Sequence, residues 1–181
     1  MGNCAENTAK KLSISREEQD EYAIESYRRA KHAWDNSEFA EEIVEVTLTT
    51  KRGAVVVSKD EEYEAIKLDK IPSLKPAFQK EGGTITAANS STFSDGASAV
   101  VLGNTAMVKE YGSGSRVLAR IVSYADAATK PIDFPLAPTL AIPKALNKAG
   151  LEIKDIAKWE INEAFAAVSK ANEKVRIFFP F

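Results

Sequence analysis

The second half of the chain alternates predicted strands with predicted helices, and this order constrains the fold more than any other feature. The apolar run at residues 117–128 predicts a long buried strand, and residues 137–150 predict a helix that ends at Gly150. A short predicted strand at 156–161 and a predicted helix at 164–174 follow. Strand–helix–strand–helix order is typical of α/β proteins. We therefore expect an α/β fold.

The first third predicts two helices and a hairpin. Residues 4–12 predict a short helix, and Ser15-Arg16-Glu17-Glu18 is a capping box that opens a long helix ending near 35–37. Residues 43–50 and 54–58 are rich in β-branched side chains and are separated by Lys51-Arg52-Gly53, which predicts a β-hairpin.

The composition of the chain changes in its middle, from charged residues to small residues. Residues 59–82 are charged and contain prolines, which predicts an exposed loop with short helical turns. The small-residue segment 82–103 ends in an apolar run, 97–102, that predicts a strand. Residues 104–112 predict a helix, and the Gly-Ser-Gly-Ser stretch at 112–115 predicts a linker.

Composition excludes several classes of protein. The chain of 181 residues is 44% hydrophobic and 28% charged, which is ordinary globular composition. Its net charge of −2 gives no attraction toward nucleic acid or an anionic membrane surface, so we expect neither partner. No apolar stretch approaches the roughly 20 residues of a membrane-spanning helix. The first residues show neither a secretory signal nor a transit peptide.

The pair Asn162-Glu163 interrupts an apolar run where a predicted strand leads into a predicted helix. The planar amide of an asparagine offers both a donor and an acceptor, so it can hold a water or a carbonyl oxygen, as an oxyanion site requires. The alternative is structural: Asn162 caps the helix, and Glu163 sits favourably in its first turn.

Two other features invite a chemical interpretation. The segment 82–103 contains Ser90, Ser91 and Thr92 among small residues that let a ligand approach the backbone; the alternative is a tight turn. Cys4 and His32 are the single cysteine and the single histidine. We interpret both as structural, and together they cannot supply the ligands of a transition-metal site.

Three ordered segments resemble the thiolase family. MGNCAENTAKK at the start of the chain, GGTITAANSSTFSDGASAVVL at 82–102 and WEINEAFA at 159–166 resemble three thiolase motifs in the order and at the separation of that family. A fourth segment, ARIVSYADAATKPIDFPLAP, is similar to the mitochondrial acetoacetyl-CoA thiolases (acetyl-CoA acetyltransferases). The resemblance covers residues 1 to about 174.

The resemblance implies a thiolase-like α/β fold built from two βαβαβαββ halves with a loop domain, of which only the central part is expected here. The expected divisions are a loop domain at 1–82, the end of the first half at 83–112, the start of the second half at 115–174, and a non-homologous tail at 175–181, which we interpret as a retained intron or a mispredicted gene end.

The resemblance also implies a reaction. Thiolases catalyse the reversible Claisen condensation and thiolysis of acetoacetyl-CoA through an acyl-cysteine. Of their four active-site elements, only Asn162 is matched here. The nucleophilic cysteine, the catalytic histidine and the second cysteine are expected to lie outside residues 1–181, so this chain alone is expected to be inactive.

The family's ligand positions carry over residue by residue. Ala87 and Ser91 match residues along the pantetheine arm of coenzyme A, Lys70 matches a lysine near its nucleotide, and Phe165 matches the phenylalanine that packs on the ligand. A potassium ion is implied at the positions of Tyr27, Ala87, Ala88 and Ser90. Ala65 stands where an arginine near the nucleotide is expected.

Acyl-CoA is therefore the expected partner, and the family implies a homodimer or homotetramer. The subclass implies a mitochondrial protein. Two alternatives remain. The chain is a non-catalytic partner that binds CoA weakly or associates with thiolase subunits, or it is an unrelated α/β module that binds CoA or a nucleotide.

Overall fold

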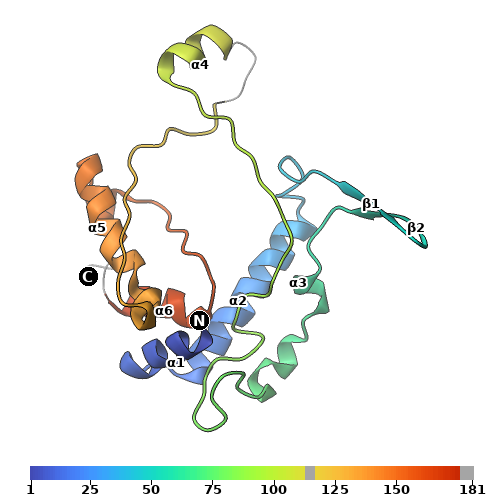
Figure 1. The fold of residues 1–181 in the computed structure, drawn as a ribbon, viewed down its shortest axis with the longest axis vertical. Helices are drawn as coiled ribbons and strands as arrows, with labels where there is room; N and C mark the ends of the chain where they lie inside the picture. The colour runs from blue at the N-terminus through green and yellow to red at the C-terminus, as the bar shows by residue number, and fades with distance from the viewer. Residues whose placement is uncertain (113–116, 176–181) are drawn as a thin grey trace.

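The computed structural model describes residues 1–112 and 117–175. The elements in chain order, with η marking 3₁₀ helices, are α1 (Gly2–Lys11), α2 (Arg16–Asp35), β1 (Val46–Thr50), β2 (Gly53–Val57), α3 (Glu62–Ala65), η1 (Leu68–Ser73), α4 (Thr105–Tyr111), η2 (Pro131–Leu136), α5 (Pro138–Ala149), η3 (Ile153–Asp155) and α6 (Ala166–Lys174). In Figure 1, α1, α2 and α6 form the packed body, and β1–β2 and α4 project from it. The predicted linker and tail lie almost wholly outside the described residues.

The long helix α2 begins as its capping box predicts. The hydroxyl of Ser15 accepts the N–H of Glu18 at 3.1 Å, and the Glu18 carboxylate accepts the N–H of Ser15 at 2.7 Å. Two of the four backbone donors that a helix start leaves unpaired are thereby satisfied. The helix ends at Asp35 with Asn36 as its C-cap, which confirms the predicted stop.

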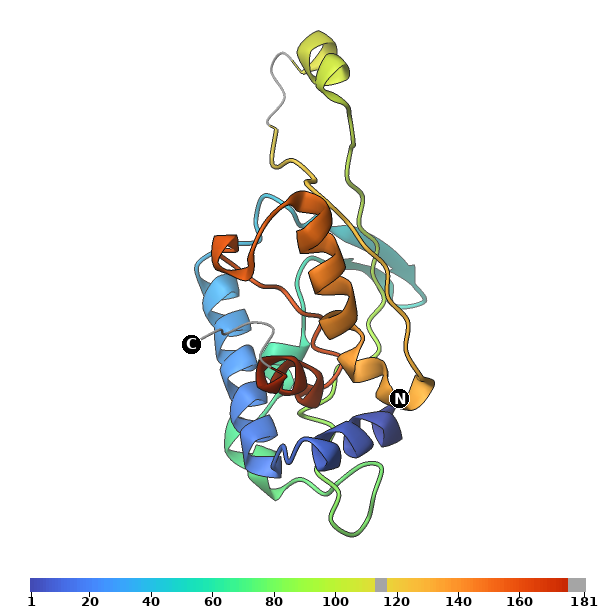
Figure 2. The same ribbon diagram turned by 90° about the vertical axis from the view of Figure 1, so that its left-hand side faces the viewer.

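A small core lies where α1, α6 and η2 meet, and α2 packs beside it against α6 (Figure 2). The fully buried positions that face one another are mainly alanines, which allow the helix backbones to approach closely. The core consists of Ala5, Ala9, Ile14, Ile85, Phe165, Ala167, Val168 and Ala171. Ile85 and Phe165 of this cluster anchor the segment around Ile85 and the turn that precedes α6. The core therefore supports the two segments that contain the predicted site residues.

The predicted hairpin is confirmed. β1 and β2 pair antiparallel, from Val46 opposite Val57 to Thr50 opposite Gly53. Gly53 has φ +122°, a conformation that other residues rarely adopt, which explains a glycine in this turn. Every residue of both strands is exposed.

The predicted loop at 59–82 contains the expected helical turns, α3 and η1, but it is not exposed throughout. Ile71 is fully buried, and Tyr63 is 9% exposed. The Tyr63 ring stacks on Trp34 of α2 with 6.0 Å between centroids. The prediction of exposure is therefore wrong at these two positions. The charged residues around them suggested an exposed loop, but each apolar side chain packs inward.

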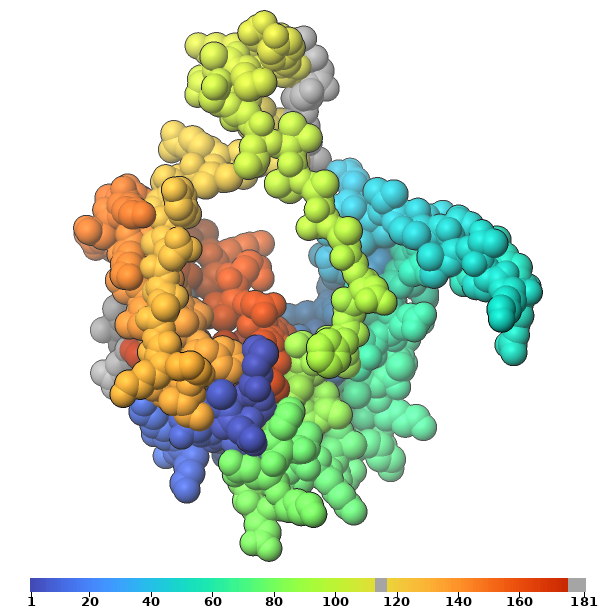
Figure 3. All heavy atoms as spheres, viewed as in Figure 1, coloured from blue at the N-terminus to red at the C-terminus, as the bar shows by residue number. Residues whose placement is uncertain are grey.

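The predicted strands at 97–102, 117–128 and 156–161 do not form within the described residues. All three segments run extended without a paired strand. The expected burial of 117–128 is also wrong, since Leu118 is 80% exposed and Ile121 69%. Figure 3 shows an open space bordered by residues of the first two segments. A strand requires a hydrogen-bonded neighbour, and none of the described segments pairs with these.

The remaining helix predictions are confirmed. Asn104 caps α4 by accepting the N–H of Met107 at 3.0 Å. α5 accommodates Pro143, and Gly150 ends it with φ +68°. None of the helices in the two described ranges combines the length and the hydrophobicity that crossing a bilayer requires.

Candidate active site

The segment 84–91 forms a turn that its own side chains close. The N–H of Thr86 donates to the Asn89 side-chain oxygen at 2.8 Å, and the N–H of Asn89 donates to the Thr86 hydroxyl at 3.3 Å. The hydroxyl of Ser90 donates to the Thr86 carbonyl at 2.6 Å. Asn89 and Thr86 are both buried. The tight-turn interpretation is therefore confirmed.

Buried acidic side chains hold this turn against the helices. The Glu6 carboxylate, on α1 and 3% exposed, accepts the N–H and hydroxyl of Thr84 and the N–H of Ile85, all near 3.0 Å. The Asp20 carboxylate of α2 accepts the Asn89 amide at 3.0 Å. A buried carboxylate is stable only when its oxygens are bonded in this way.

The arginine at the start of α2 completes this support. Arg16 Nε donates to the Asp20 carboxylate at 2.7 Å, and an Arg16 terminal nitrogen donates to the carbonyls of Ile71 and Leu74 at 3.0 Å. One guanidinium thus joins α2, the η1 region and, through Asp20, the turn at 84–91.

A short backbone bridge joins this turn to the segment before α6. Ser91 N–H donates to the Ala164 carbonyl at 3.1 Å, and Ala166 N–H donates to the Asn89 carbonyl at 2.9 Å. Ser90 and Phe165 form an isolated antiparallel pair between these two bonds. The two segments that the sequence singled out are therefore neighbours in space.

The structure places Asn162 outside the helix. The N-cap of α6 is Phe165, and no side chain caps it, so the interpretation of Asn162 as a helix cap is wrong. Glu163 likewise lies before the first turn. Asn162 is exposed at the end of an extended segment, and its amide lines a pocket.

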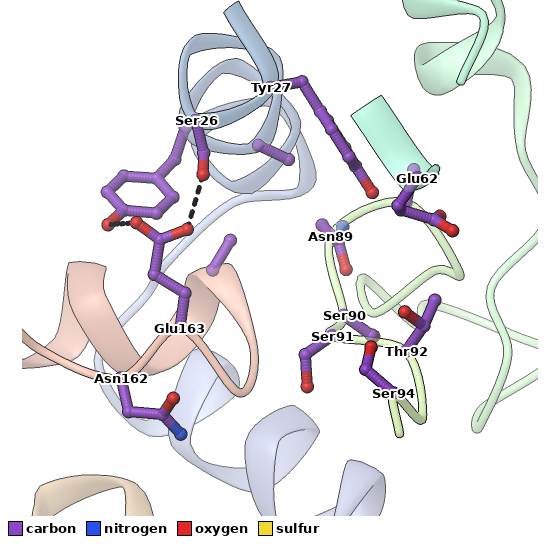
Figure 4. A pocket seen from close by; sticks show the side chains of 14 residues that line it. Ser26, Tyr27, Glu62, Asn89, Ser90, Ser91, Thr92, Ser94, Asn162 and Glu163 are labelled. Atoms are coloured by element: carbon purple, nitrogen blue, oxygen red, sulfur yellow. Dashed lines mark hydrogen bonds between the residues drawn. The ribbon is translucent and has the colours of Figure 1, made fainter. Parts of the chain in front are cut away.

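That pocket, with a volume of about 290 Å³, lies between α2, the turn at 84–91 and the Asn162 segment. Its lining residues are Tyr22, Ala23, Ser26, Tyr27, Glu62, Ala88, Asn89, Ser90, Ser91, Thr92, Ser94, Asn162, Glu163 and Ala166. Figure 4 shows Asn162 and Glu163 on one side and the hydroxyls of Ser90, Ser91, Thr92 and Ser94 on the other. The side of the pocket opposite Asn162 is therefore rich in hydroxyl groups.

Five of the predicted site residues line this pocket, and three do not. Asn162, Tyr27, Ala88, Ser90 and Ser91 are brought together.

Of the other three, Ala87 is exposed within the turn at 84–91, and Phe165 is buried. Lys70 is exposed on η1, with its ammonium 3.5 Å from the Asp69 carboxylate. The Phe165 ring meets that of Phe78 edge-on, with centroids 6.2 Å apart.

The side chains of Tyr22 and Ser26, which the sequence did not single out, hold Glu163. The Tyr22 hydroxyl donates to one Glu163 carboxylate oxygen at 2.8 Å, and the Ser26 hydroxyl donates to the other at 2.6 Å (Figure 4). Burial raises the pKa of Tyr22 to about 12, and the Glu163 charge acts in the same direction, so Tyr22 stays protonated as a donor. The i, i+4 spacing of these two residues on α2 was the only sequence signal.

Tyr27 and Glu62 form another part of the wall. Burial raises the pKa of the Tyr27 phenol above its usual value of 10.0, and the nearby Glu62 carboxylate adds to this shift. The phenol is therefore neutral at physiological pH and presents its oxygen as a dipole rather than as a charge.

Cys4 and His32 take no part in this site. Cys4 is a half-buried free thiol on α1, and exposed His32 bonds to Asn36 on α2. Within the two described ranges, no group of three or more His, Cys, Asp or Glu side chains is placed to hold a metal ion.

Comparison with known proteins places this arrangement in a family. The model of the thiolase N-terminal domain matches residues 1–106, and that of the thiolase C-terminal domain matches residues 115–177. The chain belongs to the thiolase family. This membership confirms the resemblance.

The curated relatives are thiolases named as mitochondrial acetyl-CoA acetyltransferases. The chain is 60% identical over 176 residues to the protein of Gibberella zeae and 59% identical over 178 residues to that of Rattus norvegicus. Each match covers 97% of this chain and 41% of the relative. The chain thus spans about two-fifths of the length of these thiolases.

Solved thiolase structures share the arrangement. A thiolase of Ascaris suum in complex with coenzyme A matches with a TM-score of 0.87 and 47% identity, covering 97% of this chain and 44% of that one. The acetyl-CoA acetyltransferase of Bacillus anthracis matches with a TM-score of 0.91 and 42% identity, with the same coverage. The expected partial thiolase-like α/β fold is confirmed, although three of its strands are unpaired in the described residues.

Proposed function

We propose that the whole protein is an acetyl-CoA C-acetyltransferase, which interconverts acetoacetyl-CoA plus CoA with two molecules of acetyl-CoA. One observation carries the proposal: the backbone bridge between Ser91 and Ala164 brings Asn162 and the hydroxyl-rich turn to one pocket. The names of the relatives support this choice of substrate.

In this proposal Asn162 supplies part of an oxyanion site. Its side-chain N–H, directly or through a water, stabilises the negative charge that develops on a thioester oxygen. Ser91 and Ala87 contact the pantetheine arm of CoA, Phe165 packs on the ligand, and Lys70 contacts the nucleotide. Tyr27 lines the same pocket. The CoA-bound thiolase of Ascaris suum supports a CoA site in this fold.

A potassium ion beside this pocket is part of the proposal. Tyr27, Ala88 and Ser90 line one wall, and Ala87 adjoins it. Their hydroxyl and carbonyl oxygens are of the kind that bind alkali-metal ions, and the neutral Tyr27 phenol fits this role. Potassium would supply only a fixed positive charge behind the turn at 84–91.

The test is an acetoacetyl-CoA thiolysis assay on two samples, the whole protein and the isolated chain of residues 1–181. We expect turnover from the whole protein and none from the isolated chain. An acyl-cysteine needs a thiol in the pocket, and Cys4, the only cysteine of the 181 residues, is not among its lining residues. An inactive whole protein would refute the proposed function, and thiolysis by the isolated chain that Cys4→Ser abolishes would refute the assignment of the thiol.

A second candidate function applies to the chain as a separate polypeptide: a non-catalytic partner of thiolase subunits. The exposed apolar residues Val100, Val101 and Leu118, which are 80%, 102% and 80% exposed, favour it because such surface seeks a partner. Co-purification of residues 1–181 with an active thiolase would support this role. A chain that only aggregates, as unpaired apolar strands promote, would contradict it.

We also propose a mitochondrial location and a homodimeric or homotetrameric assembly for the whole protein. The relatives named as mitochondrial support the location. Organelle fractionation tests the first proposal, and light scattering coupled to size-exclusion chromatography tests the second.

A further inference from the structure

The carboxylate next to Asn162 is held in an unusual way. Glu163 is exposed, yet both of its oxygens are bonded, one to the Tyr22 hydroxyl and the other to the Ser26 hydroxyl. Both donors are neutral and come from α2. Within residues 1–112 and 117–175, no lysine or arginine forms an ion pair with Glu163. An exposed carboxylate normally remains in water, so two short bonds from one rigid helix indicate a fixed position.

On the N-terminal side of Asn162, the side chain of Ile161 packs against the core. Residues 156–161 run extended without a paired strand. On the C-terminal side, the backbone of Ala164 and Ala166 is fixed by the bridge to the turn at 84–91. The hydroxyl pair at Glu163 therefore fixes the residue between this backbone bridge and the Asn162 amide.

The direction of the Asn162 amide depends on the backbone at Glu163. An oxyanion donor is effective only when it is already aimed at the position where charge develops. A misplacement of about 1 Å costs roughly 100-fold in rate. Since α2 is capped at its start and packed against α6, it is a rigid element that can fix the orientation of the Asn162 amide through Glu163.

We infer that Glu163 is a positioning residue, which fixes the amide of Asn162 through the hydroxyls of Tyr22 and Ser26; this inference rests on the proposed thiolase function. The role is geometric rather than electrostatic. A glutamine at this position retains two contacts, because its oxygen accepts from one hydroxyl and its amide group donates to the other. An alanine retains neither.

The test is steady-state thiolysis by the whole protein and its variants. We expect Glu163→Ala to lower kcat about 10- to 100-fold, with KM for CoA changed less than about twofold, and Glu163→Gln to restore most of kcat. Glu160→Ala, at an exposed glutamate of the same segment, is the matched control and should leave kcat unchanged.

A double-mutant cycle with Asn162→Ala distinguishes positioning from a general structural role. If Glu163 acts through Asn162, Glu163→Ala has almost no further effect in the Asn162→Ala background. A loss of the same size in both backgrounds, or an unchanged kcat in Glu163→Ala, would overturn the inference and leave the proposed function intact. No turnover in the unmodified protein would overturn both.

Folding is controlled separately. Thermal unfolding of each variant is followed by circular dichroism. If Glu163→Ala fails to fold, the double variant Tyr22→Phe with Ser26→Ala removes the same two hydrogen bonds from the other side. It should reproduce the loss of kcat, and an unchanged kcat in that folded variant would also overturn the inference.

Discussion

The N–H of Ser91 donates a 3.1 Å hydrogen bond to the carbonyl oxygen of Ala164, which lies 73 positions later in the chain. This contact and its neighbour between Ala166 and Asn89 join the two thiolase motifs along their backbones. Because the bonds involve main-chain atoms, side-chain changes at Ser91 leave the junction intact. The junction between the two segments therefore does not depend on the side chain of Ser91, which lines the pocket.

Removal of the Asn162 amide should mainly affect the chemical step. We expect Asn162→Ala in the whole protein to lower kcat by about 100- to 1,000-fold, the usual cost of one oxyanion donor. Steady-state kinetics of acetoacetyl-CoA thiolysis measure this effect. Asn147→Ala, on the exposed side of α5, is the control and should retain full activity. A variant at Asn162 with a raised KM and an unchanged kcat would contradict the oxyanion role.

Glu6 should be a stability determinant. In Glu6→Gln one carboxylate oxygen becomes an NH2 group, and because the Thr84 N–H lies against both Glu6 oxygens, that group faces another donor in either orientation. The expected loss is about 1–3 kcal/mol in the free energy of unfolding, measured by urea denaturation. Glu21→Gln, at an exposed glutamate of α2, should change it by less than about 0.5 kcal/mol. Equal stability of the two variants would show that the Glu6 bonds contribute little.

Local features of this fold could be predicted from the sequence. The capping box at Ser15 and the glycines at positions 53 and 150 could be identified because helix caps and turns depend only on residues close together in the sequence. The hairpin followed from β-branched runs on either side of a turn. The family resemblance then identified Asn162 and the serines of the turn as one site before any geometry was known.

Contacts between distant segments could not be predicted from residue patterns. The bonds from Tyr22 and Ser26 to Glu163 span 141 and 137 positions, and no spacing rule links them. The strands at 97–102 and 117–128 failed for the same reason, since pairing depends on a neighbour that an isolated segment does not specify. The helix-cap interpretation of Asn162 failed because the helix begins four residues later, at Ala166.

The capping box should make stability depend on acid pH. The hydrogen bond from the Ser15 N–H, assisted by Lys174, lowers the pKa of Glu18 below its usual value of 4.5. The folded state therefore binds the Glu18 proton less readily than the unfolded state. This stabilisation is fully present above about pH 4.5 and is lost as the pH falls through the folded-state pKa. Glu18→Gln should flatten the fall in unfolding free energy in that window, as measured by urea denaturation at several pH values.

Lys70 should contribute modestly to CoA binding. Its ammonium is exposed beside Asp69, so an added contact to a nucleotide phosphate is worth at most about 1 kcal/mol. Lys70→Ala should raise KM for CoA about two- to fivefold at low salt and less at high salt. Lys80→Ala, an exposed lysine outside the predicted CoA-binding residues, is the control. Equal effects of both variants would indicate general attraction of the anion rather than a contact.

Tyr27→Phe should separate the potassium proposal from the CoA proposal. The substitution keeps the ring that lines the pocket and removes only the oxygen that would face the ion. We expect the whole protein to be activated by added potassium chloride relative to sodium chloride, and the variant to need several-fold more potassium for half-maximal activation. Its activity at saturating potassium should stay within about threefold of the original, since one neutral contact to the ion is lost. Tyr111→Phe, at the exposed end of α4, is the control. If the unmodified protein shows the same activity in both salts, the potassium site is refuted while the CoA site stands.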